Sequence, residues 1–312
     1  MSNTLCPYLV RPLAESSEVN GEHILPSAFG APDNFTIQAD ASENQRINIE
    51  LDAPTINMSA LRMIAVSQGV KSRSGDVELK IKGVINKTGE EVNSIFSSDG
   101  FKATFRRPVE MDNKTNQVRL VKGMGKDAIR KAEAVKAAYE RKGFSVEIGE
   151  PTTLVNPTID HKLDLDLNLL NRMMVKTGYL MTVRQFGDSA IKGKSGSIYR
   201  SALIARDAEA MAGTGIGGAS FGSQVPWFLP TPRSVGHSLS CFRMGGMIIS
   251  SVTLFGIFHA FFITPSDEIS ESDLDGEIIY IDPATSTLSS IPYAESVIGL
   301  LDRLQDNLHL NS

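Results

Sequence analysis

Cysteine and tryptophan are scarce in this sequence. Its 312 residues include two cysteines, Cys6 and Cys241, and one tryptophan. Two cysteines cannot form the network of bridges that stabilises small secreted domains, and they fit a reducing compartment. Residues 1–4 lack the charged and apolar regions of a secretory signal peptide. These features exclude a disulfide-stabilised scaffold and predict a cytoplasmic protein.

Apolar runs long enough to cross a membrane are also lacking. The apolar stretch at residues 247–263 is interrupted by Gly256 and contains Ser250, Thr253 and His259. It is shorter than the ~20 residues that a spanning helix needs. Its Val, Ile and Phe residues favour one or two buried strands. We therefore expect no membrane partner.

The composition that remains is that of a globular protein. Hydrophobic residues make up 41% and charged residues 21% of the chain, which is an ordinary balance. The length predicts one large domain or two modest ones. We expect an α+β protein in three parts, at residues 1–85, 86–150 and 151–312, in which the middle part carries a basic αβ segment.

Charge is distributed unevenly along the chain. The net charge is −5, but residues 101–145 hold twelve Lys or Arg and five acids, whereas residues 266–312 hold ten acids and one Arg. Local positive charge is what binds nucleic-acid phosphates. The candidate DNA-binding residues are Arg106, Arg107, Lys126, Arg130 and Lys131.

The last three of these lie on or next to a predicted helix at residues 127–142, which is rich in Ala, Glu, Lys and Arg and is followed by Gly143 as a C-cap. Its apolar face includes Ile129. An ordinary solvated helix face is the alternative interpretation of the same charges.

One short motif indicates a catalytic site. Glu22 and His23 precede an apolar turn with Pro26 and Gly30, and Asn34 and Asn44 follow. An imidazole can take a proton from water near neutral pH, and carboxylate and amide oxygens bind hard cations such as Mg²⁺. The pattern predicts a strand, a long loop, a short strand and then a helix that starts near Ser42.

A second acid-histidine pair lacks this context. Asp160 and His161 are followed by neither a turn nor similarly placed amides. We interpret them as a surface pair before a helix.

Residues 5–75 resemble the HNH endonuclease family, whose ββα-metal finger carries an acid-His pair, a mid-loop Asn and a helical Asn or His. The segment from Glu22 to Pro26, followed by Phe29-Gly30, is similar to the "EHIIP" group of that family. The resemblance implies that His23 is the general base and that Asn34 fixes the His23 ring. It also implies that Glu22 and Asn44 hold one Mg²⁺ or Mn²⁺ against the scissile phosphate.

The zinc site found in many of these relatives is not expected here. Their two Cys-x-x-Cys pairs correspond to Cys6 and Leu9 and to Asp40 and Glu43 in this chain. A structural zinc site needs four ligands, mostly thiolates in such sites, so we predict no structural zinc.

The resemblance implies a metal-dependent endonuclease that hydrolyses DNA, with roles in restriction or phage defence. Two alternatives stay open: a decayed HNH-fold module that binds nucleic acid without cutting it, and an RNA-cleaving, toxin-like nuclease. A homodimer or a partner subunit from a defence system also stays open.

The pattern in the rest of the sequence predicts helices, strands and loops that support the site as a scaffold. We expect an amphipathic helix at residues 165–186, helices at 197–212 and 294–308, and a strand-like segment at 144–148. Residues 213–218 satisfy the G-x-G-x-x-G pattern, but they follow a helix, so we predict a loop instead of a dinucleotide site.

Overall fold

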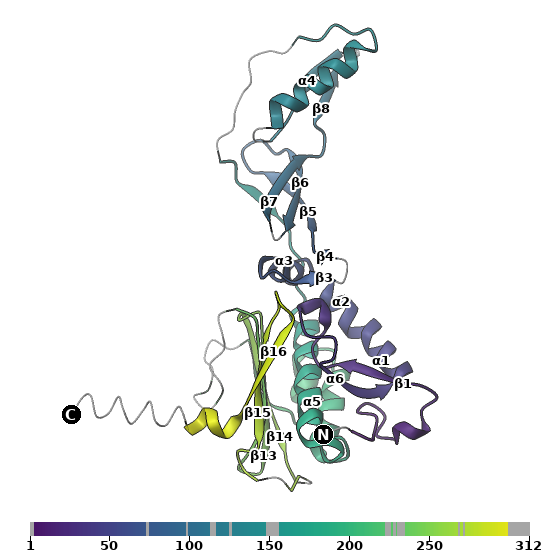
Figure 1. Ribbon diagram of the computed structural model, residues 1–312, viewed down its shortest axis with the longest axis vertical. Helices are drawn as coiled ribbons and strands as arrows, with labels where there is room; N and C mark the ends of the chain where they lie inside the picture. Colours follow the sequence, from purple (N-terminus) through teal and green to yellow (C-terminus); the bar gives the residue numbers. More distant parts are fainter. Residues whose placement is uncertain are drawn as a thin grey trace, which may run out of the picture. The chain divides into compact units, whose positions relative to one another are not determined.

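The computed structural model describes residues 3–72, 75–97, 99–112, 117–124, 127–147, 156–221, 226, 229, 235–267, 269–270 and 272–298. The chain is a mixed α+β protein with antiparallel sheets (Figure 1). It divides into two compact units, one of residues 1–75 with 165–312 and one of residues 76–164. We call them unit 1 and unit 2.

These units do not coincide with the boundaries expected from the sequence at residues 85 and 150. Unit 2 is inserted in the chain between the two parts of unit 1. The difference arises because the residues after 164 share one hydrophobic core with the N-terminal segment, including Leu25, Phe29, Tyr179 and Phe255.

A six-stranded antiparallel sheet forms the larger layer of unit 1. Its order is β11-β14-β13-β12-β15-β16. The strands are β11 (Gly217–Ser220), β12 (His237–Met244), β13 (Met247–Leu254), β14 (Phe258–Pro265), β15 (Gly276–Asp282) and β16 (Thr287–Pro292). The prediction of buried strands at residues 247–263 is confirmed. Gly245 and Gly246, with φ of 58° and 75°, make the tight turn between β12 and β13.

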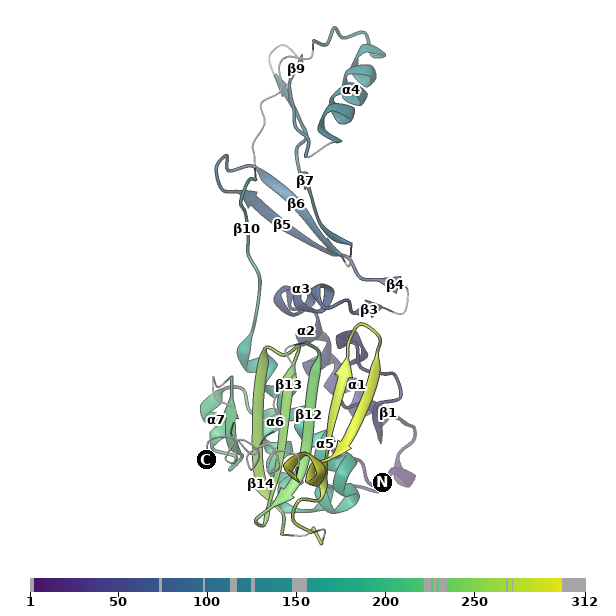
Figure 2. The ribbon, with the colours of Figure 1, turned by 60° about the vertical axis from the view of Figure 1, so that its left-hand side comes forward.

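Helices α5 (Leu167–Lys192) and α6 (Lys194–Ile204) pack on one face of this sheet (Figure 2). We expected an amphipathic helix at 165–186, but α5 is buried on almost every side between residues 173 and 183. The reason is that α5 packs against the sheet and also against β2 and the short helices of the N-terminal segment. Gly178 permits this close approach, since a Cβ there would lie 2.7 Å from Ser250 Oγ.

The N-terminal segment of unit 1 has the predicted order of strand, loop, strand and helix. After η1 (Leu13–Glu15) it contains β1 (Val19–His23), η2 (Ser27–Phe29), β2 (Thr36–Asp40), α1 (Ala41–Ile47), the π-helical η3 (Asn48–Asp52), α2 (Ala53–Ile56), α3 (Ser59–Ser67) and β3 (Lys71–Ser72). Pro54 lacks an N–H and stands where the π-helical turn passes into α2, within one continuous helical run.

Unit 2 contains a four-stranded antiparallel sheet, a hairpin and a helix. The sheet has the order β10-β5-β6-β7, and the hairpin pairs β8 with β9. Its elements are β5 (Leu79–Ile85), β6 (Glu91–Ser97), β7 (Gly100–Phe105), β8 (Val109–Asp112), β9 (Gln117–Val121), α4 (Asp127–Glu140) and β10 (Ile159–His161), and β4 (Gly75–Asp76) stands where the two units join in the chain. The helix predicted at 127–142 is therefore confirmed.

Several local predictions were wrong. Asp160 is exposed and α5 follows at Leu167, but Asp160 and His161 lie on a strand that pairs with β5, and the half-buried His161 has its Nε2 2.7 Å from Ser94 Oγ. Residues 144–147 form no strand. The helix expected at 197–212 is divided into α6 and α7 (Ala208–Ala212).

The loop at residues 213–216 and the start of the terminal helix lie where they were predicted. Residues 213–216 form the predicted loop, and β11 follows at once. The terminal helix is present at residues 293–298, and its remainder lies outside the described residues, as does Trp227. Among the helices that the structure describes, none is long and apolar enough to span a membrane.

Candidate functional site

The β1–β2 hairpin positions the acid-His pair at the end of its first strand. Glu22 is opposite Ile37, and His23 is opposite Thr36. Successive side chains of a strand point to opposite faces, so Glu22 and His23 face different surroundings. Glu22 is buried and His23 is half-buried, whereas Asn34 is exposed in the connecting loop.

Helix α1 begins at a cap formed by Asp40. Its carboxylate accepts hydrogen bonds from the backbone N–H groups of Ser42 and Glu43 and lies 2.7 Å from the Arg11 guanidinium. The Ser42 hydroxyl and Arg11 hold the pKa of Asp40 well below its usual range. The cap residue is thus Asp40, two residues before the predicted start.

The Asn44 side chain links α1 to β1 by hydrogen bonds. Its amide Nδ2 donates to Asn20 Oδ1 at 2.7 Å and to the Gly21 carbonyl at 3.2 Å. Asn44 therefore lies next to the strand residue that precedes Glu22. The contact explains how helix and hairpin hold a fixed position relative to each other.

Glu22 belongs to a buried group of charges that the motif around Glu22 did not predict. Lys176 of α5 places its ammonium between Glu22 Oε1 and Asp52 Oδ2, and the Lys176–Asp52 distance is 2.6 Å. The side-chain exposures are 0% for Lys176, 1% for Glu22 and 9% for Asp52. We call these three residues the acid-lysine triad.

The triad is consistent with the pKa shifts of its members. Burial disfavours the charged form of Lys176, but the charges of Glu22 and Asp52 outweigh it and raise its pKa. Burial raises the pKa of Glu22, and Lys176 partly offsets this. Burial and the same two carboxylates raise the pKa of the neighbouring Tyr8 hydroxyl. Two carboxylates and one ammonium leave one excess negative charge in the interior.

The donor set around Glu22 does not fit a divalent cation in this arrangement. The Lys176 ammonium occupies the space between the two carboxylates, and a metal ion would have to displace it. Asn44 directs its amide N–H groups to β1. Within the described ranges, no group of three or more His, Cys, Asp or Glu is placed to hold a metal. The assignment of Glu22 and Asn44 as metal ligands stays a prediction.

The predicted DNA-binding residues lie in unit 2. Arg106 and Arg107 are exposed after β7, and Arg106 lies 2.7 Å from the carboxylate of Glu91. Arg130 and Lys131 are exposed on α4. Lys126 lies outside the described residues.

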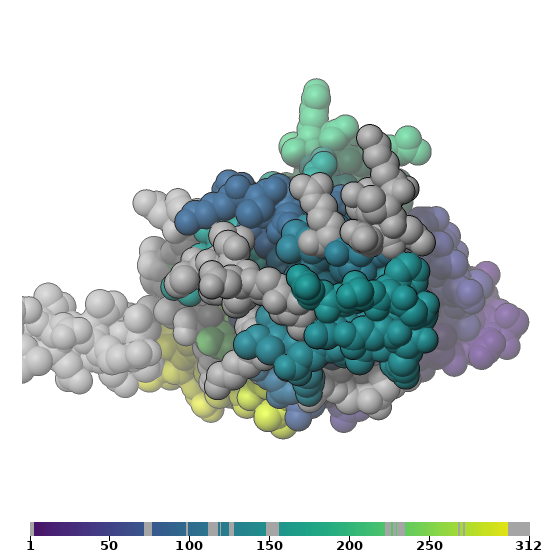
Figure 3. Space-filling view, turned by 90° about the horizontal axis from the view of Figure 1, so that it is seen from above, coloured from purple at the N-terminus to yellow at the C-terminus, as the bar shows by residue number. Residues whose placement is uncertain are grey.

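Charges of opposite sign separate around α4. At about 100° per residue, Arg130 and Lys131 lie about 100° apart on α4, and Arg141 and Lys142 follow its last residue, Glu140; all four basic residues are exposed. Glu133 and Glu140 project on another side. Figure 3 shows the side chains of α4, in teal, at the molecular surface.

The apolar face of α4 differs from the prediction at one residue. Ile129 was expected on the inner face, but it is 67% exposed. It lies about 80° from the inward-facing Tyr139 side of the helix.

The sequence did carry one signal for the triad. Lys176 is the one charged residue in the otherwise uncharged run from Met173 to Val183. A lysine that is buried on an apolar helix requires an acidic partner. That signal identifies Lys176, although it does not say which carboxylate pairs with it.

No family model, curated protein or solved structure matches this chain.

Proposed function

We propose that this protein binds nucleic acid through the basic surface of unit 2 and carries an HNH-type finger that does not cut. The observation that supports binding is the charge separation on α4. Phosphate backbones bind to local basic surface irrespective of the protein's net charge.

A second basic surface in unit 2 supports the same proposal. Side chains alternate along β5, with Lys80 and Lys82 on its exposed face. Lys80 pairs across the sheet with Ile95, and Ile95 pairs with the exposed Lys102 of β7. Lys80, Lys82 and Lys102 therefore share one face of the sheet, where Lys80 lies 3.8 Å from the carboxylate of Glu78.

The acid-lysine triad favours a module without hydrolytic activity. An HNH endonuclease needs a carboxylate that is free to bind a cation, whereas the Glu22 carboxylate is buried against Lys176. Removing Lys176 from between two buried carboxylates would be costly. The finger would then serve as a rigid part of unit 1.

A metal-dependent DNA endonuclease is the second candidate. The order β1-β2-α1, with His23 at the end of the first strand and Asn44 on the helix, favours it. In this candidate His23 would accept a proton from the attacking water, and Glu22 would hold Mg²⁺ or Mn²⁺ in place of the Lys176 ammonium.

One set of assays tests both candidates. Duplex DNA is incubated with wild type and with His23→Ala in Mg²⁺, Mn²⁺ or EDTA, and binding is measured on the same samples by gel shift. We expect a shifted, intact duplex in every case. Nicking by wild type alone that is lost in EDTA would establish the endonuclease instead, and the absence of any shift would refute nucleic-acid binding to duplex DNA.

A further inference from the structure

A cavity of about 290 Å³ opens on unit 1 between α1 with η3 on one side and α5 with α6 on the other. Its polar lining is mainly basic and hydroxylic. It includes Tyr8, Arg46, Glu50, Arg172, Ser197, Arg200 and Ser201.

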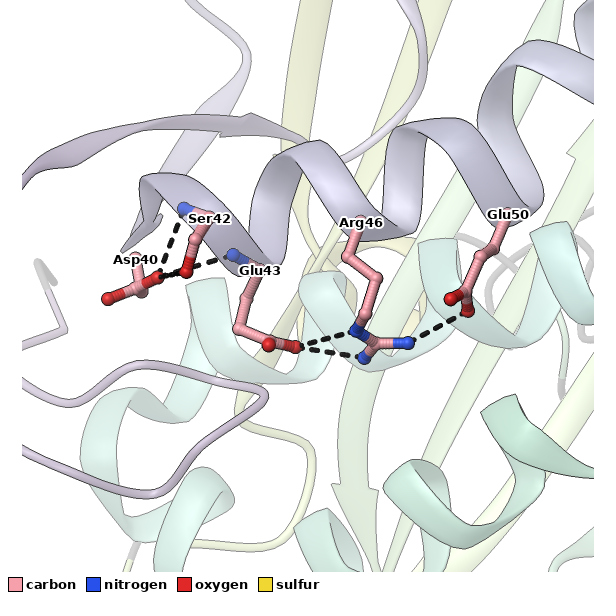
Figure 4. A network of polar contacts seen from close by, with 5 residues as sticks. All are labelled: Asp40, Ser42, Glu43, Arg46 and Glu50. Carbon is pink, nitrogen blue, oxygen red and sulfur yellow. Dashed lines mark hydrogen bonds and ion pairs between the residues drawn. The ribbon is translucent and has the colours of Figure 1, made fainter.

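Arg46 is already neutralised by its neighbours on the helix. Its guanidinium contacts Glu43 at 2.9 Å and Glu50 at 2.8 Å (Figure 4). Among the described residues that line the cavity, Glu50 is the only acidic one. Glu43, Arg46 and Glu50 formally carry one excess negative charge, so this side of the cavity contributes no positive charge for a ligand.

Arg172 and Arg200 are held by neutral groups. Arg172 Nε donates to the Leu203 carbonyl at 2.9 Å, and Arg200 Nη1 donates to the Ile191 carbonyl at 2.9 Å. Arg200 Nη1 also lies 3.0 Å from the Tyr179 hydroxyl. In the described part of the chain, neither arginine takes part in an ion pair.

These contacts orient the two arginines and leave their charges uncompensated. Both side chains are half-buried, so water screens them less than it would on an open surface. Ser197 and Ser201 are exposed one turn apart on α6 and can donate hydroxyl hydrogen bonds. Tyr8 interacts electrostatically with Glu22 and Asp52, and the single ammonium of Lys176 offsets one of these two carboxylate charges.

We propose that this cavity binds a phosphate group, with Arg172 and Arg200 as its charged donors. Guanidinium groups bind phosphate oxygens in pairs with fixed geometry. The volume is at the small end of ligand sites and suits a phosphate with one attached sugar, not a duplex. The ligand is a phosphorylated end of a nucleic acid or a free phosphate. The site lies in unit 1 and does not depend on DNA binding by unit 2.

Calorimetric titration of the full chain tests the site. The probes are inorganic phosphate, a 5′-phosphorylated dinucleotide and the same dinucleotide without its 5′-phosphate. We expect the phosphorylated dinucleotide to bind at least about tenfold more tightly than its unphosphorylated counterpart, as charge-assisted hydrogen bonds require. Comparable binding of inorganic phosphate would identify a free phosphate as the ligand, and its weaker binding would identify a nucleic-acid end.

Variants identify the residues. Arg172→Gln with Arg200→Gln should reduce the affinity at least about tenfold, whereas Arg206→Gln, an exposed arginine of unit 1 outside the cavity, should not change it. Ser201→Glu places a negative charge at an exposed position of the cavity lining and should also abolish binding. This variant tests the proposal if the double variant does not fold. Equal affinity for both dinucleotides, or an equal reduction in the Arg206 control, would overturn the proposal.

Discussion

At the scale of single residues, the interior of unit 1 contains buried charges of opposite sign, in which two carboxylates share one ammonium. Glu22 is one residue from His23 in sequence, but its partner Lys176 comes from α5, far along the chain. Burial of all three members of the acid-lysine triad means that their energies are coupled. Removal of one member leaves the others uncompensated in a medium that solvates them poorly.

Lys176→Met should therefore destabilise the protein by about 3–5 kcal/mol, because two buried carboxylates lose their cation. Chemical denaturation measures the change in the free energy of unfolding. Lys194→Met, at an exposed lysine of unit 1, is the matched control and should cost less than about 0.5 kcal/mol.

The triple variant Lys176→Met, Glu22→Gln, Asp52→Asn should recover part of that stability, since it removes the buried charges together. If Lys176→Met and Lys194→Met had equal effects, the triad would contribute nothing to stability.

His237 gives the stability of the fold a dependence on pH. Its Nε2 donates to the Phe29 carbonyl at 2.8 Å, and its Nδ1 accepts from the Phe255 N–H at 3.2 Å. The ring must be neutral to make both bonds, and burial lowers its pKa to about 4. The unfolded chain takes up the proton near pH 6.5.

The contribution of neutral His237 to the free energy of unfolding should therefore be fully present above pH 6.5. It should decrease as the pH falls toward 4, by up to ~3 kcal/mol. Urea denaturation at several pH values measures it. His237→Gln should be less stable at neutral pH, and its stability should change less over this interval than that of wild type. Parallel curves for the two proteins would show that His237 does not titrate as described.

At the scale of elements, the sequence predicted what depends on local pattern. The order β1-β2-α1, the helix α4 and the strands at 247–263 all follow from turn residues, helix formers or apolar runs. It did not predict β10, because the partner of Asp160 and His161 is β5, which is remote in sequence. Periodicity also could not show that α5 is covered on several sides. The motif around Glu22 located a ββα arrangement, but the electrostatic partner of Glu22 depends on tertiary packing.

The loop after β1 is fixed against the sheet at Gly30. This residue has φ of 87°, and a Cβ there would lie 2.5 Å from Pro283 Cα. Gly215 has φ of 82° and no atom within 4 Å of such a Cβ. Gly215→Ala should cost about 1–2 kcal/mol of backbone strain, and Gly30→Ala should cost roughly 1–3 kcal/mol more because of the clash.

Thermal or urea denaturation compares these two variants. Because both glycines belong to unit 1 and have nearly the same φ, the difference between them isolates the contact with Pro283. Equal destabilisation of the two variants would mean that the loop can move away from the sheet without cost.

At the scale of the whole molecule, the two units carry net charges of opposite sign. Unit 2 contains sixteen Lys or Arg and fourteen Asp or Glu, so its net charge is +2, and the rest of the chain carries −7. An insertion with the opposite sign of charge from its host can bind a polyanion that the host would repel. Its affinity should depend on the number of phosphates that it neutralises and therefore on salt.

Arg130→Glu with Lys131→Glu should weaken binding to duplex DNA and flatten the dependence of log K on log salt by about 1 for each phosphate that α4 no longer neutralises. Lys192→Glu with Lys194→Glu makes the same change of net charge at exposed lysines of unit 1. Gel-shift or anisotropy titrations at several salt concentrations measure both slopes. If only the net charge mattered, the two double variants would weaken binding equally. Weaker binding by the α4 variant alone would instead show that the phosphate backbone touches that helix, because only a local interaction changes the number of ions released.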